Sequence, residues 1–388
     1  MPRTNRLPNT LILSIRECAS PTPTRLTRNP TAHLSSRLAS SSSRAAALSR
    51  RISIPPPFPV TSTCPEPSCS CAPTPAMPEG LEIDYAQNLN GTMAAYSQQV
   101  LISTGRGDWR SRIEEDGVGC GWGELARGLK GLVGRGGGFA DPYNNILITN
   151  SSFAPHQPTP TTPSPSTTHT ASALLFPSFT YLPTIPLDKP SLTNLVRAFL
   201  LPTTPHPAHD VLPAAQKATM SRVPALQPSF ENRTSIQHSP TILICGHGHR
   251  DQRCGIMGPL LRDEFRRVLR DRGFSVRDGG DSSSSSDTGG DAGIVDGVGQ
   301  ANVGLISHIG GHKYAGNVII YLPPALEFPN ATEEDRGVGV SLRGKGVWYG
   351  RVEPRHVEGI VEETVLGGRV VRDHFRGGVG GNGEILRL

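Results

Sequence analysis

A fixed succession of apolar and amphipathic segments fills the last third of this 388-residue chain. Residues 241–245 (T-I-L-I-C) are typical of a short buried strand. After a polar loop, apolar residues recur at helical spacing over residues 257–272, and Gly273 follows as a left-handed helix terminator. Residues 274–277 can form a second strand. The sequence therefore predicts a β-α-β unit in this region.

Three further strands and a helix are predicted after that unit. Residues 303–307, 318–322 and 347–352 are apolar runs of strand length, and Pro354 opens a helix that ends at two glycines. A β-α-β unit followed by β, β and α is the arrangement of the thioredoxin fold, which is built on a mixed sheet. We therefore expect an α/β fold with a thioredoxin-like domain over residues 241–376.

A smaller α/β domain is predicted ahead of it, over residues 80–201. Residues 99–103 and 145–149 are apolar runs typical of buried strands, and Ser191 is expected to cap a helix. The order of these strands in a sheet does not follow from the pattern.

Not all of the chain is expected to fold. The 43 Gly and 36 Pro make up about a fifth of the residues, and aromatic residues only 5%. The Gly-rich residues 117–138 and the Pro/Thr/Ser-rich residues 155–170 cannot bury enough apolar surface to become ordered. The other segments assigned outside the domains are a linker rich in Pro, Ser and Cys (52–79), a second linker (202–240), a loop insertion (279–299) and a Gly-rich tail (377–388).

The formal net charge of +5 resides at the amino-terminal end. Residues 1–51 contain nine Arg, no Lys, nine Ser and one acidic residue, whereas the remainder carries a net charge of −3. An Arg-rich, Ser-rich and acid-poor segment is typical of a mitochondrial transit peptide. The alternatives are a disordered basic tail or a chain start placed upstream of the true one at Met77 or Met93. We expect a mitochondrial protein of the matrix or the intermembrane space.

Two classes of partner are not expected. No basic patch with interleaved aromatic residues occurs after Arg51, so nothing in the sequence points to nucleic acid. No apolar stretch reaches the length of a membrane span, which is about 18 residues.

The chemically unusual residues gather in two segments. Residues 245–254 are C-G-H-G-H-R-D-Q-R-C, and residues 307–317 are S-H-I-G-G-H-K-Y-A-G-N. Each begins where a predicted strand ends, and loops at one edge of an α/β sheet commonly form its site. The two thiols and two imidazoles expected to meet there form a candidate set of four ligands: Cys245, Cys254, His308 and His312.

A [2Fe–2S] cluster suits this set better than zinc does. In a compact zinc finger the thiols lie two to four residues apart and the histidines follow about a dozen residues later. Here 53 residues separate Cys254 from His308. Two thiolates and two imidazoles are the ligands of a Rieske-type cluster. Gly310 and Gly311, which have no Cβ, would let the backbone fold tightly around such a bulky group.

These residues resemble the sucrase/ferredoxin-like family of fungi and plants, and within it the fungal altered inheritance of mitochondria protein 32 group. The resemblance rests on C-x-H-x-x-R-D-x-R-C (residues 245–254), on H-x-G-G-H-K-Y-A-G-N-V-I-I-Y (308–321) and on W-Y-G-R-V (348–352). Shorter upstream matches extend it to about residue 64. It implies a thioredoxin-like ferredoxin, with the four candidate ligands holding a [2Fe–2S] cluster and a role in mitochondrial redox or thiol homeostasis.

Motif residues beside the ligands are expected to support them. Arg250 and Arg253 would stabilise a cluster that has gained an electron, and Asp251 would pair with an arginine to fix the loop. His249, close to His247, is a competing ligand. The complete supporting set is His247, Arg250, Asp251, Arg253, Gly310, Gly311, Lys313 and Asn317.

The leading hypothesis is therefore a mitochondrial one-electron carrier, rather than an enzyme with its own substrate, whose partner is an unidentified redox donor or acceptor protein. The alternatives are a thiol-disulfide oxidoreductase or thiol redox sensor that uses Cys245 and Cys254, and a zinc-stabilised structural module. Against the thiol alternative, eight residues separate the two cysteines and no predicted helix directly follows Cys245. Three further cysteines, Cys64, Cys69 and Cys71, receive no role.

Overall fold

The computed structural model describes residues 56–388 apart from residues 69, 157–169, 279–293 and 338–340. The described residues belong to one compact unit, Ile54–Leu388. The predicted transit peptide, Cys69, nearly all of the 155–170 stretch and most of the 279–299 insertion lie outside the described residues.

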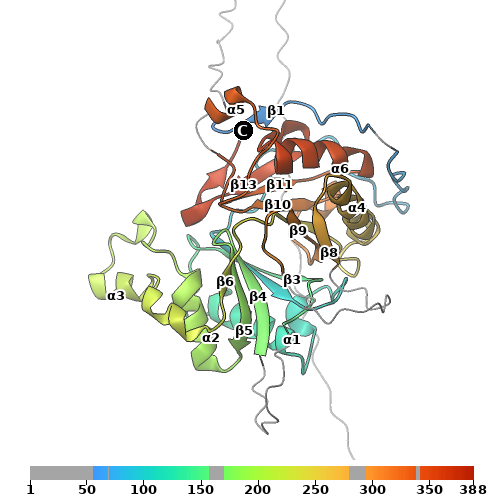
Figure 1. Cartoon of the computed structure of the whole chain (residues 1–388). Helices are drawn as coiled ribbons and strands as arrows, with labels where there is room; N and C mark the ends of the chain where they lie inside the picture. The colour runs from blue at the N-terminus through green and yellow to red at the C-terminus, as the bar shows by residue number, and fades with distance from the viewer. Residues whose placement is uncertain (1–55, 69, 157–169, 279–293, 338–340) are drawn as a thin grey trace, which may run out of the picture. The chain divides into compact units, whose positions relative to one another are not determined.

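One mixed sheet of 12 strands runs through this unit (Figure 1). In chain order its strands are β2 (Gln98–Ser103), β3 (Ile146–Ser151), β4 (Thr170–Phe176), β5 (Thr180–Pro186), β6 (Thr234–Ser235), β7 (Thr241–Cys245), β8 (Ser275–Asp278), β9 (Gln300–Ile306), β10 (Val318–Leu322), β11 (Lys345–Tyr349), β13 (Phe375–Val379) and β14 (Ile385–Leu386). They lie in the order β14-β13-β11-β10-β7-β9-β3-β2-β4-β5-β6, and β8 pairs with β9. Both predicted domains therefore contribute strands to the same sheet. The structure does not test the boundary predicted between them.

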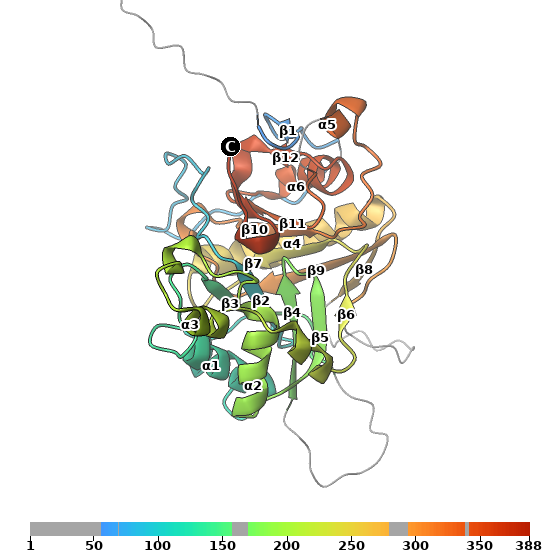
Figure 2. The same cartoon turned by 90° about the vertical axis from the view of Figure 1, so that its left-hand side faces the viewer.

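Helices cover this sheet and join its strands. They are α1 (Gly121–Val133), α2 (Lys189–Leu195), α3 (Ala214–Thr219), α4 (Gln252–Asp271), α5 (Glu333–Gly337) and α6 (Pro354–Ile360). Single π-helical segments, Val196–Leu200 and Val361–Leu366, continue α2 and α6, and short 3-10 turns lie at Ile113–Glu115, Pro207–His209, Pro224–Ser229, His312–Tyr314, Arg372–His374 and Gly381–Gly383. A separate parallel pair, β1 (Val60–Thr61) with β12 (Val370–Val371), lies near α6 (Figure 2).

The carboxy-terminal strands have the predicted thioredoxin-like arrangement. Strand β7 pairs in parallel with β9 and antiparallel with β10, which pairs antiparallel with β11. Helix α4 packs against β7 and β9 and lies beside α6. The α/β fold is therefore confirmed. One detail is wrong: β8, predicted as the second strand of the β-α-β unit, lies beyond β9, and β9 is the parallel partner of β7.

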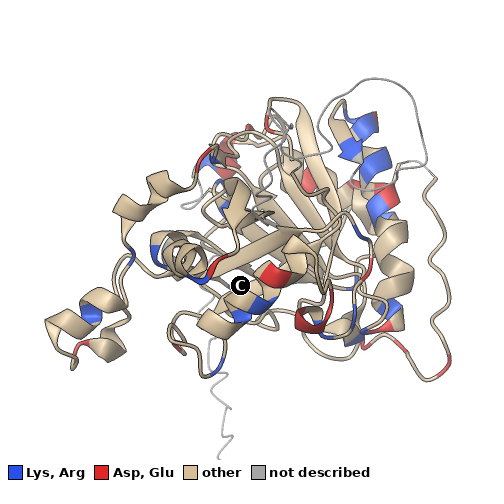
Figure 3. Cartoon of the chain, turned by 90° about the horizontal axis from the view of Figure 1, so that it is seen from below, with Lys and Arg blue, Asp and Glu red and all other residues tan. Residues whose placement is uncertain are grey.

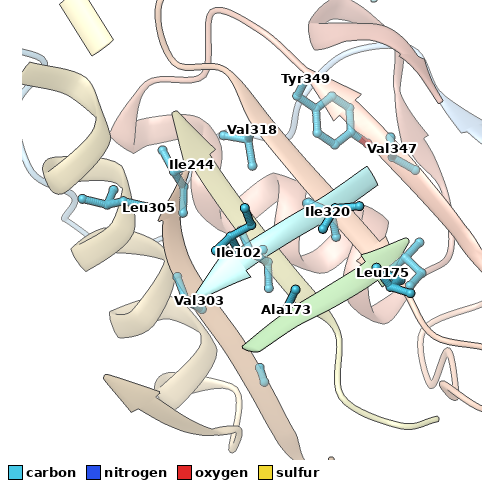
Figure 4. Packing of buried hydrophobic residues seen from close by; sticks show 14 of the residues in the cluster. Ile102, Ala173, Leu175, Ile244, Val303, Leu305, Val318, Ile320, Val347 and Tyr349 are labelled. Carbon is cyan, nitrogen blue, oxygen red and sulfur yellow. The ribbon is translucent and has the colours of Figure 1, made fainter. Parts of the chain in front are cut away.

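The side chains of the central strands alternate between two apolar cores because successive strand residues point to opposite faces. On β7, Ile242 and Ile244 belong to the core that also receives the helices, part of which Figure 4 shows. Leu243 and Cys245 belong to the second core, on the other face, together with Trp348 of β11. The alternation places the sulfur of Cys245 on the face opposite the helix-covered core.

The exposed side of α4 carries acidic and basic residues that neighbour one another (Figure 3). Arg267 pairs with the exposed Asp271 at 2.8 Å and also with the buried Glu264 at 2.6 Å. Spacings of three and four residues place such charges on one helix face. The apolar residues of α4 therefore face the sheet, as the helical spacing predicts.

Three local predictions are wrong. The Gly-rich stretch 117–138 is not disordered, since it forms α1, whose Trp122, Leu125 and Leu129 are buried at helical spacing. Helix α2 is capped by Asp188, whose carboxylate accepts a hydrogen bond from the backbone N–H of Ser191, the residue predicted as the cap. The Gly-rich tail is paired, because β14 forms a ladder with β13.

The half-buried His356 and the buried His374 make the fold sensitive to acid. The rings of His356 on α6 and His374 lie 4.2 Å apart, centroid to centroid. Burial lowers the pKa of His356 to about 4 from an ordinary value of 6.5, and that of His374 in the same direction. The unfolded chain therefore binds more protons than the folded chain below pH 6.5.

The free energy of unfolding is accordingly expected to fall by about 1–2 kcal/mol between pH 6.5 and pH 4 through His356, after allowance for its partial exposure. Urea unfolding of the wild type and of His356→Gln at both pH values measures the part of this loss that is due to His356. The variant should lose less stability on acidification than the wild type. Equal losses in the two proteins would contradict the assignment.

Candidate dithiol site

Cys245 and Cys254 are buried next to each other. Cys245 ends β7, and Cys254 lies in the first turn of α4, which begins earlier than predicted. Their exposed fractions are 2% and 1%, and both are free thiols. Both belong to the same buried cluster, and each thiol is the largest influence on the pKa of the other. The loop between them therefore closes the eight-residue separation that counted against a thiol pair.

The start of α4 is fixed by Asp251. Its carboxylate accepts a hydrogen bond of 3.0 Å from the backbone N–H of Arg253, and it pairs with the guanidinium through Nε and Nη2, both at 2.9 Å. The predicted Asp–Arg pair is present, and it caps the helix that carries Cys254.

Close backbone approach brings the helix to the strand end. A Cβ on Gly258 of α4 would lie 2.5 Å from the Cα of Gly246 and 2.8 Å from the carbonyl oxygen of Cys245. A Cβ on Gly255 would lie 2.7 Å from the Cα of Gly248. Only glycine fits such contacts, and they hold Cys254 against Cys245.

The two sulfurs differ in acidity. The pKa of the Cys245 thiol is held well below its ordinary value, first by the hydrogen bond from Cys254, with further contributions from His308 and the backbone N–H of His247, while burial opposes the shift. The pKa of the Cys254 thiol is raised by its bond to Cys245 and by burial. Cys245 is therefore the more acidic sulfur of the pair.

His247 joins the two chemically unusual loops. Its Nδ1 accepts a 2.9 Å hydrogen bond from the backbone N–H of His308. Its Nε2 lies 2.9 Å from the carbonyl oxygen of Trp109 and 3.0 Å from that of Arg110. Because Nδ1 accepts, Nε2 carries the ring proton and donates it. His247 thus positions the loop that brings His308 to Cys245.

His308 and His312 lie close together at the site. Their ring centroids are 5.2 Å apart, and Nε2 of His312 is 3.9 Å from Oδ2 of Asp251. Among the described residues the Nδ1 atoms of both rings are buried without a hydrogen-bond partner. The turn between the rings has positive φ at Gly310 (86°) and Gly311 (74°), as the tight fold predicted for these glycines requires.

The sequence analysis missed Arg376, whose side chain holds the turn between His308 and His312. Its side chain is fully buried. Its Nη1 donates to Asn317 Oδ1 at 2.7 Å and to the carbonyl oxygen of Gly310 at 3.2 Å, and its Nη2 donates to the carbonyl oxygen of Thr92 at 2.9 Å. Asn317 donates in turn to Gly311, and its own carbonyl oxygen accepts from the backbone N–H of Cys245. Nothing in the local sequence around Arg376 distinguishes it from a surface arginine.

Other predicted supporting residues lie at the rim of the site. Arg250 donates to Ser111 Oγ at 3.2 Å, and Lys313 pairs with Asp84 at 2.9 Å. His249, considered as a competing ligand, is 70% exposed and pairs with Asp108. These three side chains point away from the sulfurs.

The remaining described cysteines lie elsewhere. The thiol of Cys64 donates to the carbonyl oxygen of His356 at 3.4 Å, and burial raises its pKa to about 12. Cys71 is half-buried and Cys120 is exposed. Cys64 and Cys71 are both free thiols.

The prediction of a ferredoxin that transfers electrons is wrong. Across the described residues, no group of three or more His, Cys, Asp or Glu side chains is arranged so that it could hold a metal ion. Of the two rings, that of His312 has its Nε2 3.9 Å from Oδ2 of Asp251. A zinc-stabilised module fails for the same reason. A [2Fe–2S] cluster as cofactor, and the four residues as its ligands, stay predictions of the sequence that the structure does not test.

A sucrase/ferredoxin-like family model matches residues 89–377. The chain therefore belongs to the sucrase/ferredoxin-like family, and the resemblance stated from its motifs is confirmed. It is 29% identical to altered inheritance of mitochondria protein 32 of Debaryomyces hansenii over 325 residues, which cover 81% of this chain and 95% of that protein. The identity to the protein of the same name from Meyerozyma guilliermondii is 27%, with 82% and 95% covered.

A shorter match links the chain to actin patches distal protein 1 of Saccharomyces cerevisiae, with 33% identity over 32% of this chain and 29% of that protein. No solved structure matches the chain significantly. Within the described residues, none of the helices has both the length and the apolar character needed to cross a bilayer.

Proposed function

We propose that the chain is a thiol redox protein in which Cys245 and Cys254 form a reversible disulfide. The observation that carries the proposal is that two buried free thiols lie in one cluster, where α4 packs closely on the end of β7. A thiolate is the reactive form of cysteine, and a neighbouring thiol can resolve its oxidised product. Of the three functions considered from the sequence, the electron carrier and the zinc-stabilised module require a metal, and the thiol redox protein does not.

Burial of the sulfurs favours a small oxidant. With 2% and 1% exposed, neither sulfur can meet a sulfur atom on the surface of another folded protein. A hydroperoxide is small enough to enter through local opening of the loops. The proposed activity is therefore that of a hydroperoxide-responsive dithiol, rather than of an oxidoreductase that acts on protein disulfides.

The reaction balances with a hydroperoxide as the oxidant. The Cys245 thiolate attacks the terminal peroxide oxygen, the O–O bond breaks, and the departing oxygen takes up a proton, which leaves Cys245 as a sulfenic acid. The Cys254 sulfur then attacks the Cys245 sulfur, the S–S bond forms and water leaves with the thiol proton. The dithiol loses two electrons and the peroxide gains them. A low-molecular-weight thiol would reverse the step by disulfide exchange.

The proposed location is the mitochondrion. The two relatives that match most of the chain are named for altered inheritance of mitochondria, and residues 1–51 have the composition of a transit peptide. In this proposal a small hydroperoxide and a low-molecular-weight thiol take the place of the redox donor or acceptor protein expected from the sequence.

Thiol counting after peroxide treatment tests the function. The reduced full chain is exposed to hydrogen peroxide, and the free thiols are then alkylated and quantified at each cysteine. The wild type should lose the thiols of Cys245 and Cys254 together. Cys254→Ser should stop at a sulfenic acid on Cys245, and Cys245→Ser should leave Cys254 reduced.

Cys120→Ser is the matched control, because Cys120 is exposed and far along the chain from the pair; it should behave as the wild type does. Retention of both thiols in the wild type, or oxidation of Cys254 at the wild-type rate in Cys245→Ser, would reject the proposal.

A further inference from the structure

A cavity of about 560 Å³ lies where the chain enters β2 and β3 and where the loop after the π-helical continuation of α2 passes both. Its walls come from residues 95–98, 141–145 and 202–207, with Arg222, Gly383 and Ile385. A volume of this size is typical of a site for a small molecule. None of the described residues that line it belongs to the dithiol site.

Arg222 brings a positive charge to the wall of this cavity. Its Nε donates to the carbonyl oxygen of Leu201 at 2.8 Å, and its backbone N–H donates to that of Pro202 at 2.8 Å. Burial lowers the pKa of the guanidinium, and within the described part of the chain no carboxylate pairs with it to offset that effect. Its two terminal nitrogens can therefore bind an oxyanion, which a guanidinium holds through two parallel hydrogen bonds.

The carboxylate at this cavity, that of Asp141, is already occupied. Nε2 of His209 lies 3.1 Å from each of its two oxygens, and Oδ1 also accepts a hydrogen bond of 2.9 Å from the backbone N–H of Tyr143. The Asp141 side chain is 9% exposed. Asp141 therefore leaves the guanidinium of Arg222 without a counterion.

A second polar group at the wall has no partner. Gln98 begins β2 and is 6% exposed, and its Oε1 is buried without a hydrogen-bond partner among the residues that the structure describes. Such an orphaned acceptor costs free energy. The adjacent amide of Gln99 is satisfied, since it donates to Thr149 at 2.8 Å and accepts from Tyr321. A ligand that carries an O–H or N–H donor would supply the partner that Gln98 lacks.

Flat rings form much of the remaining wall. The rings of Tyr143 and His206 are stacked, with centroids 4.3 Å apart and planes 9° apart. Prolines at both ends of the 202–207 loop and Pro142 also line the cavity. Aromatic and proline rings offer apolar surface to a ligand while a few polar groups orient it. The cavity therefore suits a ligand with a flat, apolar body.

We propose that this cavity binds a small organic anion with such a body. Arg222 holds its carboxylate or phosphate group, and Gln98 accepts a hydrogen bond from a hydroxyl or amino group on the same ligand. The proposal joins three separate observations: a guanidinium without a counterion, an amide oxygen without a donor, and a cavity of ligand size. It does not depend on the function proposed for the two thiols.

Isothermal titration calorimetry of the full chain tests the site with three probes: para-hydroxybenzoate, para-hydroxyphenyl phosphate and the neutral para-hydroxybenzamide. The wild type should bind at least one anion about tenfold more tightly than the amide, and the tighter anion distinguishes a carboxylate from a phosphate ligand. Arg222→Met should weaken anion binding about tenfold and leave amide binding unchanged. Gln98→Leu should weaken the binding of these hydroxylated probes about threefold.

Arg233→Met is the matched control, because Arg233 is exposed, donates to one carbonyl oxygen, that of Gln227, and does not line the cavity. It should bind all three probes as the wild type does. Equal affinities of the wild type for the anions and the amide would overturn the proposal. Unchanged anion binding in folded Arg222→Met or in folded Gln98→Leu would overturn it as well.

Two substitutions of Thr204 cover the case in which Arg222→Met does not fold. Thr204 lines the cavity and is exposed, so a charge can be placed there without entering the interior. Thr204→Lys should raise the anion affinity about threefold and Thr204→Glu should lower it by as much, while amide binding stays the same. Equal anion affinities in these two variants would contradict an anion bound at this cavity. Because no thiol reacts in these titrations, failure of the disulfide proposal leaves their outcome unaffected.

Discussion

Arg376→Met is expected to lower the free energy of unfolding by about 3–5 kcal/mol, the largest stability effect that we predict for a single side chain. The substitution preserves much of the apolar volume but removes every donor. The carbonyl oxygens of Thr92 and Gly310 and the side-chain oxygen of Asn317 would then be left without their partner in the interior. Burial lowers the pKa of Arg376 to about 10, so the guanidinium is still charged at neutral pH and its bonds are charge-assisted.

Urea unfolding followed by circular dichroism measures this change. Arg336→Met is the matched control, because its guanidinium is 60% exposed and pairs with the exposed Glu333 of the same helix, α5. Its effect should stay within about 0.5 kcal/mol. Equal free energies of unfolding for the two arginine variants would mean that the buried guanidinium does not hold the turn between His308 and His312.

Gly258→Ala is expected to destabilise the fold by about 2–3 kcal/mol, although alanine favours helices over glycine. The new methyl group would meet the backbone of Gly246 and Cys245, which cannot rotate away as a side chain can. Helix α4 must then shift, and Cys254 with it, so the yield of the disulfide after peroxide treatment should fall as well.

Gly131→Ala provides the matched comparison within another helix. Gly131 lies on the exposed side of α1, and nothing lies within 4 Å of the position that its Cβ would take. This substitution should stabilise the protein by about 0.5–1 kcal/mol. Opposite signs at the two glycines are the predicted result in urea unfolding, and stabilisation by both alanines would contradict the close packing of α4 on β7.

Local patterns predicted the elements whose own residues decide their structure. Residues 318–322 form β10 as predicted, since an apolar run of that length has few alternatives to a buried strand. Helix α1 was not predicted, because its glycines hid the spacing of Trp122, Leu125 and Leu129. The pairing of β9 with β7 was also missed. It depends on a contact across the sheet, which no local pattern contains.

In the candidate site, too, local residues predicted some features, and contacts across the fold decided the others. Two loops that start at the ends of neighbouring strands were expected to meet, and Cys245 and His308 do. The burial of the site residues, by contrast, depends on segments from the whole chain. The role of Arg376 and the attachment of Lys313 to residue 84 arise from segments more than 200 residues apart, so the sequence motifs could not reveal them. The proximity of the two thiols, on which the proposed function rests, depends on the loop geometry.

Disulfide mapping of the full chain after hydrogen peroxide treatment tests the central claim most directly. The account predicts an intact mass lower by two hydrogen atoms and one cross-linked peptide pair that joins Cys245 to Cys254. It predicts that a low-molecular-weight thiol restores the original mass. Overoxidation of Cys245 to a sulfinic acid while Cys254 stays a free thiol would contradict it, because the two sulfurs would then not act as a pair.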